Sequence, residues 1–193
     1  MKGPDPIRQF KRSLARAEAK RLPLANAMGL ATVGAQGRPS VRMMLLKGVS
    51  KRGFVFYTNL ESRKARELQK RPYASLCFWW PGLQEQVRVE GRVKRLGGPE
   101  ADAYFATRPR GSQLAAWASR QSRTLASRKA LLKEFDLLKK IYRGRRVPRP
   151  PFWSGFVLVP ERIEFWRGRS HRLHERVLFK QRGRKWTREE LYP

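Results

Sequence analysis

Two adjacent cations stand where a predicted strand is followed by a predicted helix. Phe54–Thr58 is rich in aromatic and β-branched residues, which is typical of a buried strand, and the residues after it have helical composition. Arg63 and Lys64 therefore fall at the start of the helix. Thr58 or Asn59 can cap this end, where free N–H groups point outward. Positive charge there is unfavourable with the helix dipole, so the pair indicates a bound anion. An ordinary exposed helix start is the alternative.

A second pair of cations, Arg42 and Lys47, brackets the apolar residues 43–46. Residues five apart lie on opposite faces of an ideal strand. A site shared by both cations would therefore need a bulge in the strand or an interface with a second subunit.

A third segment combines a phenol, a guanidinium and a hydroxyl near the end of a predicted helix. These groups are Tyr104, Arg108 and Ser112. Because a guanidinium forms strong, directed hydrogen bonds to phosphate oxygens, the set indicates a phosphate-binding site.

The fourth segment lies near the C-terminus. Arg172, His174 and Arg176 alternate in the sequence, so in an extended chain they line one face. Three cationic or titratable groups on one face repel each other unless an anion or an acid lies between them. A solvated edge strand is the alternative.

Several other kinds of site are not predicted. The sequence has neither a glycine-rich dinucleotide-binding fingerprint nor a P-loop. Cys77, the one cysteine, falls inside a predicted strand and is expected to be a small core residue. His171 and His174 have no neighbouring Cys or Asp that would complete a set of ligands, so no metal site is expected.

The chain is strongly basic. It carries 44 Lys and Arg against 15 Asp and Glu, for a formal charge of +29 over 193 residues. The basic residues are spread along the chain and form no tail. A basic nucleic-acid-binding module is one interpretation, and a solvated basic surface is the other.

Hydrophobic patterning predicts a mainly β protein with inserted helices. One helix has an apolar stripe formed by Ile7, Phe10, Leu14 and Ala17, and a later one has Leu131, Phe135, Leu138 and Tyr142 at similar spacing. The predicted helices are Asp5–Lys20, Ser62–Arg71, Pro99–Thr107 and Ser122–Arg143. The predicted strands are Met28–Val33, Ser40–Lys47, Phe54–Thr58, Tyr73–Trp80, Gln84–Leu96, Phe152–Pro160, Ile163–Arg167 and Arg176–Gln181. Short strands that mostly follow one another indicate an antiparallel barrel or meander.

The length favours a single domain over residues 1–193. Within it we expect an N-terminal helix (1–22), a long inserted helix (122–143) and a C-terminal block of strands (152–193) that carries the fourth segment. The sequence shows no signal peptide and no apolar stretch long enough to span a bilayer. A cytoplasmic location is therefore the expectation.

Together the four segments resemble the pyridoxamine 5′-phosphate oxidase family, which is FMN-dependent. The resemblance runs from about Asp5 to Pro193 and is most specific over Ile163–Arg176. Independent matches occur in the same order at Arg42–Lys47, Phe54–Lys64, Tyr104–Ser122 and Pro151–Trp153. The resemblance implies an antiparallel split β-barrel and a homodimer, with FMN bound in the interface by residues of both chains.

Site residues follow from the resemblance position by position. FMN would be bound by Arg42, Met43, Met44, Leu45, Leu46, Lys47, Tyr57, Thr58, Arg63, Lys64, Gln86, Gln121, Ser122, Trp166 and Arg176. The substrate phosphate would be bound by Lys47, Tyr104, Arg108 and Ser112. Arg172 and His174 would lie against the pyridine ring as the catalytic pair.

The implied reaction oxidises pyridoxamine 5′-phosphate or pyridoxine 5′-phosphate to pyridoxal 5′-phosphate, with O2 as the oxidant and hydrogen peroxide as a product. Ammonia is released from the amine. The alternative within the same fold is an FMN oxidoreductase acting on another substrate, such as a phenazine precursor.

Overall fold

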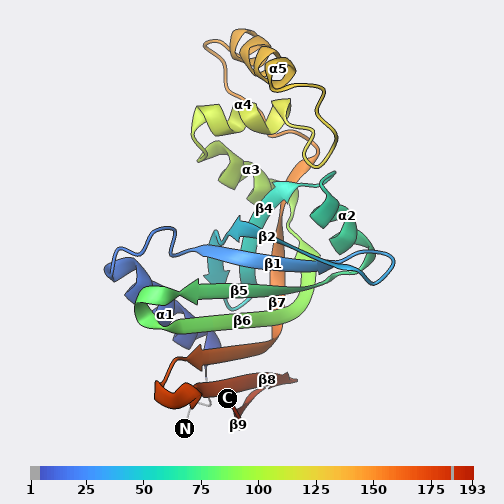
Figure 1. Cartoon of the computed structure of the whole chain (residues 1–193). Helices are drawn as coiled ribbons and strands as arrows, with labels where there is room; N and C mark the ends of the chain where they lie inside the picture. Colours follow the sequence, from blue (N-terminus) through green and yellow to red (C-terminus); the bar gives the residue numbers. More distant parts are fainter. Residues whose placement is uncertain (1–4, 184) are drawn as a thin grey trace.

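The computed structural model describes residues 5–183 and 185–193 and contains an antiparallel sheet that curls into half a barrel (Figure 1). The strand order is β2-β1-β5-β6-β7-β4-β3, with β8 paired to β7 and β9 paired to β8. The strands are β1 (Ala27–Val33), β2 (Pro39–Leu45), β3 (Gly48–Ser50), β4 (Gly53–Asn59), β5 (Tyr73–Trp80), β6 (Glu85–Arg95), β7 (Trp153–Arg167), β8 (Glu175–Arg182) and β9 (Lys185–Leu191). The helices are α1 (Pro6–Ala19), α2 (Arg63–Lys70), α3 (Gly98–Ala106), α4 (Arg110–Ala118) and α5 (Arg128–Ile141), with short 3-10 turns η1 (Pro81–Leu83) and η2 (Ser170–Arg172).

The long strand β7 pairs with three other strands, β4, β6 and β8. Its first half pairs with β4 and its second half with β8 along one edge, while β6 runs along the other edge. The register between β6 and β7 shifts at Glu90 and Gly91. A Cβ atom on Gly91 would lie 2.0 Å from the Val159 carbonyl oxygen, so this close approach requires glycine. The irregularity bends both strands and helps the sheet to curl.

Helix α1 supplies the centre of the core. The Phe10 ring is fully buried and lies 4.8 Å, centroid to centroid, from the rings of Phe54 and Phe78. Burial of an aromatic side chain of this size contributes about 1.5–3 kcal/mol. The predicted apolar stripe of this helix is confirmed, because its other members, Ile7, Leu14 and Ala17, lie in or against the same core.

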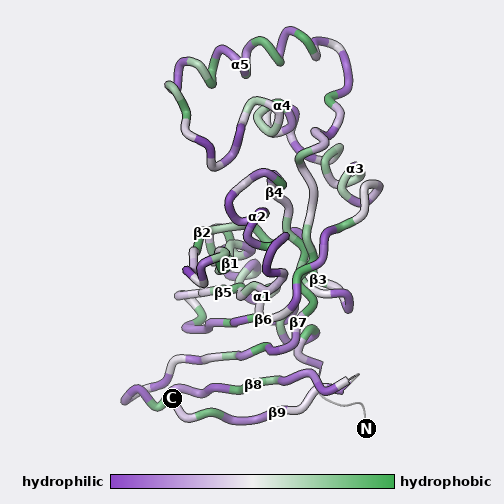
Figure 2. Tube along the Cα trace, turned by 90° about the vertical axis from the view of Figure 1, so that its right-hand side faces the viewer, coloured by the Kyte–Doolittle hydropathy of each residue, from purple (hydrophilic) through white to green (hydrophobic). Residues whose placement is uncertain are grey.

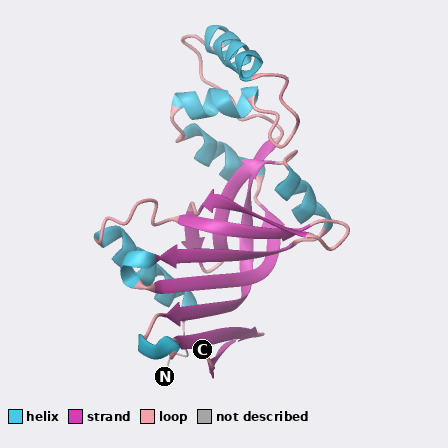
Figure 3. Cartoon of the chain, viewed as in Figure 1, coloured by secondary structure: helices cyan, strands magenta, loops and turns pink. Residues whose placement is uncertain are grey.

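Helices α3, α4 and α5 form a separate group at one end of the sheet (Figures 1 and 3). In Figure 2, hydrophilic and apolar residues alternate along α5. Its predicted stripe packs on a second apolar cluster that includes Phe105, Leu114 and Trp153. Since Trp153 begins β7, this cluster connects the helical group to the sheet.

Several predicted elements differ from the observed ones. The two strands predicted on either side of Pro160 are one strand, because Pro160 lies at the bulge opposite Gly91, where β7 bends without ending. The helix predicted over 122–143 begins only at Arg128, where the Ser127 hydroxyl accepts a hydrogen bond from the Ala130 N–H at 3.1 Å. Helix α4 and strands β3 and β9 were not predicted.

Cys77 differs from its prediction as well. It is only partly buried, because it points away from the face of β5 that carries the core residues Leu76 and Phe78. Burial nevertheless raises the pKa of its thiol.

Within the described ranges, no helix is both long enough and apolar enough to cross a membrane. The same residues contain no group of three or more His, Cys, Asp or Glu side chains that could bind a metal ion.

Candidate active site

The start of α2 is the most densely charged part of the candidate site. Strand β4 continues through Asn59, and the helix begins at Arg63, within one residue of its predicted start, with Ser62 as its N-cap. The Ser62 hydroxyl accepts a hydrogen bond from the Ala65 N–H. The prediction that Thr58 or Asn59 caps the helix is wrong, because Thr58 is still paired in the sheet and the Asn59 side chain accepts from the Glu61 N–H.

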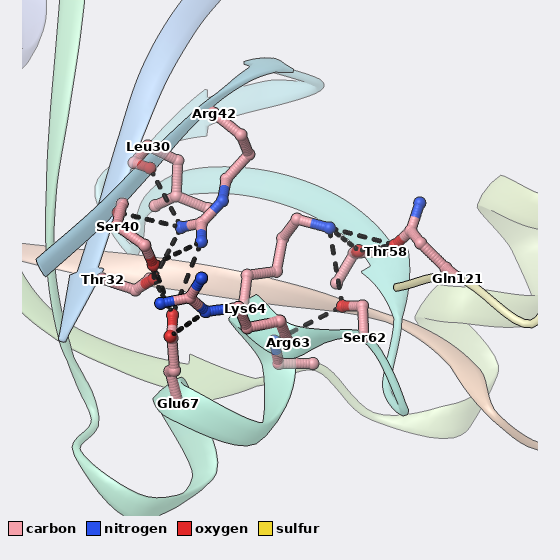
Figure 4. Close-up of polar contacts among 11 residues, drawn as sticks. Leu30, Thr32, Ser40, Arg42, Thr58, Ser62, Arg63, Lys64, Glu67 and Gln121 are labelled. Atoms are coloured by element: carbon pink, nitrogen blue, oxygen red, sulfur yellow. Dashed lines mark hydrogen bonds and ion pairs between the residues drawn. The ribbon is translucent and has the colours of Figure 1, made fainter. Parts of the chain in front are cut away.

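Lys64 is a buried cation with polar neighbours. Its ammonium group donates to the Thr58 hydroxyl at 3.2 Å and to the Gln121 side-chain oxygen at 3.0 Å (Figure 4). Burial, together with the nearby positive charge of Arg42, lowers the pKa of Lys64 to about 8. Bringing an anion to this group would favour its charged form.

Arg42 and Arg63 meet at the carboxylate of Glu67. The Glu67 side chain is buried between α2 and the strands β1 and β2, and Figure 4 shows both guanidinium groups directed toward it. Arg63 Nε donates to it at 2.8 Å and Arg42 Nη2 lies 3.5 Å from it. Burial alone would raise the pKa of Glu67, but hydrogen bonds from Thr32, Arg63 and Ser40 outweigh it and lower the pKa to about 2.

A cavity of about 440 Å³ adjoins this charged cluster. Thr58 and Gln121, which bind Lys64, also line the cavity. The remaining lining includes all four residues predicted for the substrate phosphate and several predicted for FMN. They are Met43, Met44, Leu45, Lys47, Tyr57, Tyr104, Arg108 and Ser112, with Asn59, Ala115, Ala116, Ser119 and Trp153.

Aromatic rings form one wall of the cavity. Tyr57 and Tyr104 stack with their centroids 3.9 Å apart, and Trp153 stacks on Tyr57 at 5.3 Å. The Arg108 guanidinium lies 4.8 Å from the Trp153 ring centroid. Burial lowers the pKa of Arg108, and its buried Nη1 atom has no hydrogen-bond partner among the described residues. An unpaired guanidinium N–H beside a cavity is suited to an anionic ligand.

The segment from Arg42 to Lys47 is divided between three places. Arg42 belongs to the charged cluster and Lys47 lines the cavity, so the two cations reach one continuous region even though the strand ends between them. The Leu46 side chain instead lies in the core, 4% exposed.

Ser122 has a left-handed backbone (φ 70°) and lines a neighbouring cavity.

The remaining predicted residues lie at the other end of the sheet. Gln86, Trp166 and Arg176 occupy directly paired positions on β6, β7 and β8, and Trp79 on β5 extends the row. Directly paired residues in an antiparallel sheet share a face. The rings of Trp79 and Trp166 lie 5.9 Å apart, edge to face. The structure therefore places these side chains side by side on the sheet, and none of them lines the cavity near α2.

Arg176 is held by a buried carboxylate in the same way as Arg63. Its Nε donates to Glu164 at 2.9 Å, and Arg88 binds the other carboxylate oxygen. Burial raises the pKa of Glu164, but the hydrogen bonds from Arg176 and Arg88 outweigh it and the net pKa is lowered. The hydrogen bond that Arg176 donates to Glu164 raises the pKa of Arg176.

Arg172, His174 and Arg176 do not line one face of an extended strand, so that expectation is wrong. His171 and Arg172 have left-handed backbones (φ 56° and 61°) and form the turn η2, while β8 begins only at Glu175. His174 lies against Trp166, with ring centroids 4.6 Å apart. Its Nδ1 accepts a hydrogen bond from the Arg169 N–H at 3.2 Å. The turn exposes Arg172 beside the row of paired residues.

Sequence reasoning missed Glu67 and Trp153 as site residues. The spacing of Arg63 and Glu67 by one helical turn was the available signal for the first, since it predicts an ion pair. Trp153 was noted only as part of a matching segment, and its contact with Arg108 depends on chain pairing that local patterns do not show.

Comparison with known proteins identifies the family of the chain. Residues 14–142 match the family described as pyridoxamine 5′-phosphate oxidase, and residues 153–193 match a pyridoxine 5′-phosphate oxidase C-terminal dimerisation region. A pyridoxine/pyridoxamine 5′-phosphate oxidase of Rubrobacter xylanophilus is 54% identical over 98% of this chain and 88% of its own length. A protein of the same name from Myxococcus xanthus is 53% identical over 98% of this chain and 92% of its own.

Solved structures show the same fold. PhzG from Burkholderia lata, crystallised with tetrahydrophenazine-1-carboxylic acid, has a TM-score of 0.93 and 34% identity, covering 98% of this chain and 93% of that one. A pyridoxamine 5′-phosphate oxidase-related, FMN-binding protein of Nostoc punctiforme has a TM-score of 0.80 and 20% identity, covering 100% of both chains.

The half-barrel with its cation-lined cavity defines a split-barrel flavin-dependent oxidoreductase. The chain belongs to the pyridoxamine 5′-phosphate oxidase family. The predicted family, fold, enzyme class and FMN cofactor are confirmed, and the match to the dimerisation region confirms the predicted homodimer.

Proposed function

We propose that the protein oxidises pyridoxamine 5′-phosphate and pyridoxine 5′-phosphate to pyridoxal 5′-phosphate at two sites shared between the subunits of its homodimer. The carrying observation is that one region of the chain presents two adjoining sets of phosphate-binding groups. Arg42, Arg63 and Lys64 form the first set at the start of α2. Lys47, Tyr104, Arg108 and Ser112 form the second set in the adjoining cavity. A phosphorylated flavin and a phosphorylated substrate together require two such sets.

The first set fits the FMN phosphate. Lys64 is a buried cation. Its lowered pKa indicates that no neighbouring negative charge fully balances its positive charge, and a bound phosphate would supply that negative charge. The three cations and Glu67 sum to a formal charge of +2. A phosphomonoester carries about −1.5 to −2 at pH 7. Tyr57, Thr58 and Gln121 line the adjoining cavity, where they would contact the flavin.

The second set fits the substrate phosphate. Arg108 is fixed by its contact with Trp153, and its free Nη1 faces no competing acceptor among the described residues. Lys47 adds an exposed ammonium group and Ser112 a hydroxyl on the first turn of α4. Charge-assisted hydrogen bonds of this type contribute about 1.5–3 kcal/mol each.

A second copy of this chain completes the site. Gln86, Trp166 and Arg176 share one face of the sheet, and Arg172 and His174 lie beside that row. Strand β2 carries exposed apolar residues, Val41, Met43 and Leu45, and a sheet face of this kind favours burial against another protein surface. Packing this face against its counterpart would bring the row of one subunit to the cavity of the other.

FMN, when bound, supplies the hydride-accepting chemistry, and the protein supplies orientation and charge. The first set would hold the flavin phosphate, and the second set would hold and orient the substrate through its phosphate. Arg172 and His174 would contact the pyridine ring and favour its reactive protonation state. In the net reaction, pyridoxamine 5′-phosphate, water and O2 give pyridoxal 5′-phosphate, ammonia and hydrogen peroxide; the alcohol and O2 give the aldehyde and hydrogen peroxide.

The test is an absorbance spectrum followed by a turnover assay. The purified protein, or the protein reconstituted with FMN, should show bound-flavin bands and form the aldehyde from pyridoxamine 5′-phosphate. Protein that cannot be reconstituted with FMN would contradict the proposal.

The likeness to PhzG supports a second candidate, a flavin oxidoreductase that acts on a reduced phenazine. Such an enzyme would bind FMN without oxidising either B6 phosphate. The higher identity to the named oxidases and the phosphate-binding set around Arg108 favour the first function. A basic nucleic-acid-binding module would bind DNA or RNA with a steep salt dependence, so a binding titration at several salt concentrations distinguishes it from the oxidase.

We also propose that the described chain works as one catalytic domain and that it acts in the cytoplasm. Both proposals follow from the sequence. Fractionation of cells with an antibody to the protein tests the location.

A further inference from the structure

Glu67 is a buried carboxylate inside a cluster that is otherwise built to bind an anion. It is 8% exposed and follows Arg63 by one turn of α2. The binding of FMN proposed above gives it no direct role, since a carboxylate repels a phosphate.

Both oxygens of Glu67 are occupied by donors. Oε1 accepts from Arg63 Nε at 2.8 Å. Oε2 accepts from the Thr32 hydroxyl and from the Ser40 hydroxyl at 2.9 Å, and Arg42 Nη2 lies 3.5 Å away. The carboxylate is thus anchored by two strands while it holds two cations (Figure 4). Its low pKa keeps it charged at every working pH.

The two arginines depend on Glu67 to different degrees. Arg42 also donates to the Leu30 carbonyl oxygen at 3.1 Å and to the Ser40 hydroxyl at 2.7 Å. Arg63 is 60% exposed, and Glu67 is its one side-chain partner among the described residues. Holding a long, exposed side chain in one geometry before a ligand arrives reduces the ordering cost of binding. The orientation of Arg63 therefore depends on Glu67.

We propose that Glu67 is a positioning residue for the flavin phosphate: it fixes the Arg63 and Arg42 guanidinium groups in the orientation in which they bind it. This proposal depends on the FMN site proposed above. It predicts the opposite change in phosphate binding from the one that charge repulsion alone predicts. Removing the negative charge should strengthen phosphate binding if the carboxylate only repels, and should weaken it if the carboxylate positions the arginines.

The test compares FMN with riboflavin, which lacks the phosphate, in the apoprotein of each variant. In Glu67→Gln, the amide presents an NH2 group toward donors that the carboxylate accepted from, so a guanidinium loses its fixed position. We expect the preference for FMN over riboflavin to fall about tenfold, while riboflavin affinity stays constant. General damage to the fold would weaken the binding of FMN and of riboflavin to a similar degree.

The matched control is Glu85→Gln. Glu85 is also a buried carboxylate between two arginines, Arg16 and Arg167, and neither arginine belongs to the proposed phosphate set. The preference for FMN should be unchanged in this variant, whatever its effect on stability.

A double-mutant cycle locates the effect. In an Arg63→Ala background, Glu67→Gln should lower the preference for FMN by no more than about twofold, because the positioned group is absent. If Glu67→Gln does not fold, Glu67→Asp keeps the charge but withdraws the carboxylate from Arg63, and it should also lower the preference.

The outcomes separate the two proposals. A wild-type protein without preference for FMN over riboflavin would contradict the proposed FMN site itself. A wild type that prefers FMN, with Glu67 variants that keep or increase the preference, would overturn the positioning role alone.

Discussion

The two ends of the sheet hold predicted site residues in different ways. Near α2, a charged cluster adjoins a cavity lined by residues of one chain, and Lys64 in the cluster and Arg108 in the cavity are fully or partly buried. At the other end, Trp166, Arg176 and His174 form a row along a sheet face and an adjoining turn, with Arg172 exposed beside it. We propose that the first region forms a binding site within one subunit, whereas the second is a surface that functions only against a partner.

A common device operates in both regions. A buried glutamate holds two arginines at each place: Glu67 holds Arg42 and Arg63, and Glu164 holds Arg88 and Arg176. Each glutamate has a lowered pKa because the hydrogen bonds from its partners outweigh burial. The difference between the regions therefore lies in what they enclose and not in how their cations are fixed.

The largest effect is expected in the second region. Arg172→Ala should lower kcat/KM by about a hundredfold or more, because the group that contacts the substrate ring is removed. FMN binding should be close to wild type, since the phosphate set lies in the other region. Steady-state kinetics and a flavin titration measure the two quantities, and turnover near the wild-type rate would show that Arg172 is wrongly assigned.

In the first region, Arg108→Ala should raise KM for pyridoxamine 5′-phosphate by about 10- to 100-fold, from the loss of charge-assisted hydrogen bonds to phosphate. Arg110→Ala is the matched control, because Arg110 is exposed and binds the Tyr142 and Arg145 carbonyl oxygens. An equal rise of KM in both variants would indicate a general effect of positive charge and not a phosphate site.

A smaller effect is expected for Arg63→Ala. FMN affinity should fall about tenfold, less than for a buried cation because Arg63 is mostly exposed. Arg66, one turn away in the exposed part of α2, provides the control variant Arg66→Ala. Fluorescence titration of the apoprotein measures both, and a loss in Arg66→Ala as large as in Arg63→Ala would contradict the specific role.

The smallest effect concerns pH. FMN requires charged Lys64, whose pKa is about 8 in the free protein, so affinity should be independent of this group below pH 8 and decline above it. The dissociation constant should rise about fourfold by pH 8.5. A Lys64→Arg variant keeps its charge over this range and should show no such rise; the same rise in that variant would assign the effect to another group.

The sequence predicted the local elements of the molecule, but it did not predict how the strands of the second region pair. Local patterns found the helix after β4, the apolar stripes of α1 and α5 and the alternation of β6, because each depends on neighbours within a few residues. The row of Gln86, Trp166 and Arg176 depends on register between strands distant in the chain, and no local pattern gives that register. Family resemblance named these residues without showing that they share a face.

The errors have physical causes of the same kind. Arg172 and His174 were placed on an extended strand because alternation is the strand signal, but η2 interrupts the chain with two left-handed residues, His171 and Arg172. The spacing of Arg63 and Glu67 predicted only an ion pair, because the other partners of Glu67, Thr32 and Ser40, come from the distant strands β1 and β2.

A heterodimer of two impaired variants, assayed at a substrate concentration where each parent has little activity, tests most directly whether the two regions meet only across subunits. One subunit would carry Arg108→Ala and the other Arg172→Ala, with different affinity tags so that the mixed dimer can be purified. If each site takes Arg108 from one chain and Arg172 from its partner, one site combines both substitutions and the other is intact, so the heterodimer should show about half the wild-type activity per dimer. A heterodimer whose activity per dimer is no higher than that of the two parent variants would show that each chain supplies both groups to its own site, and would contradict the account.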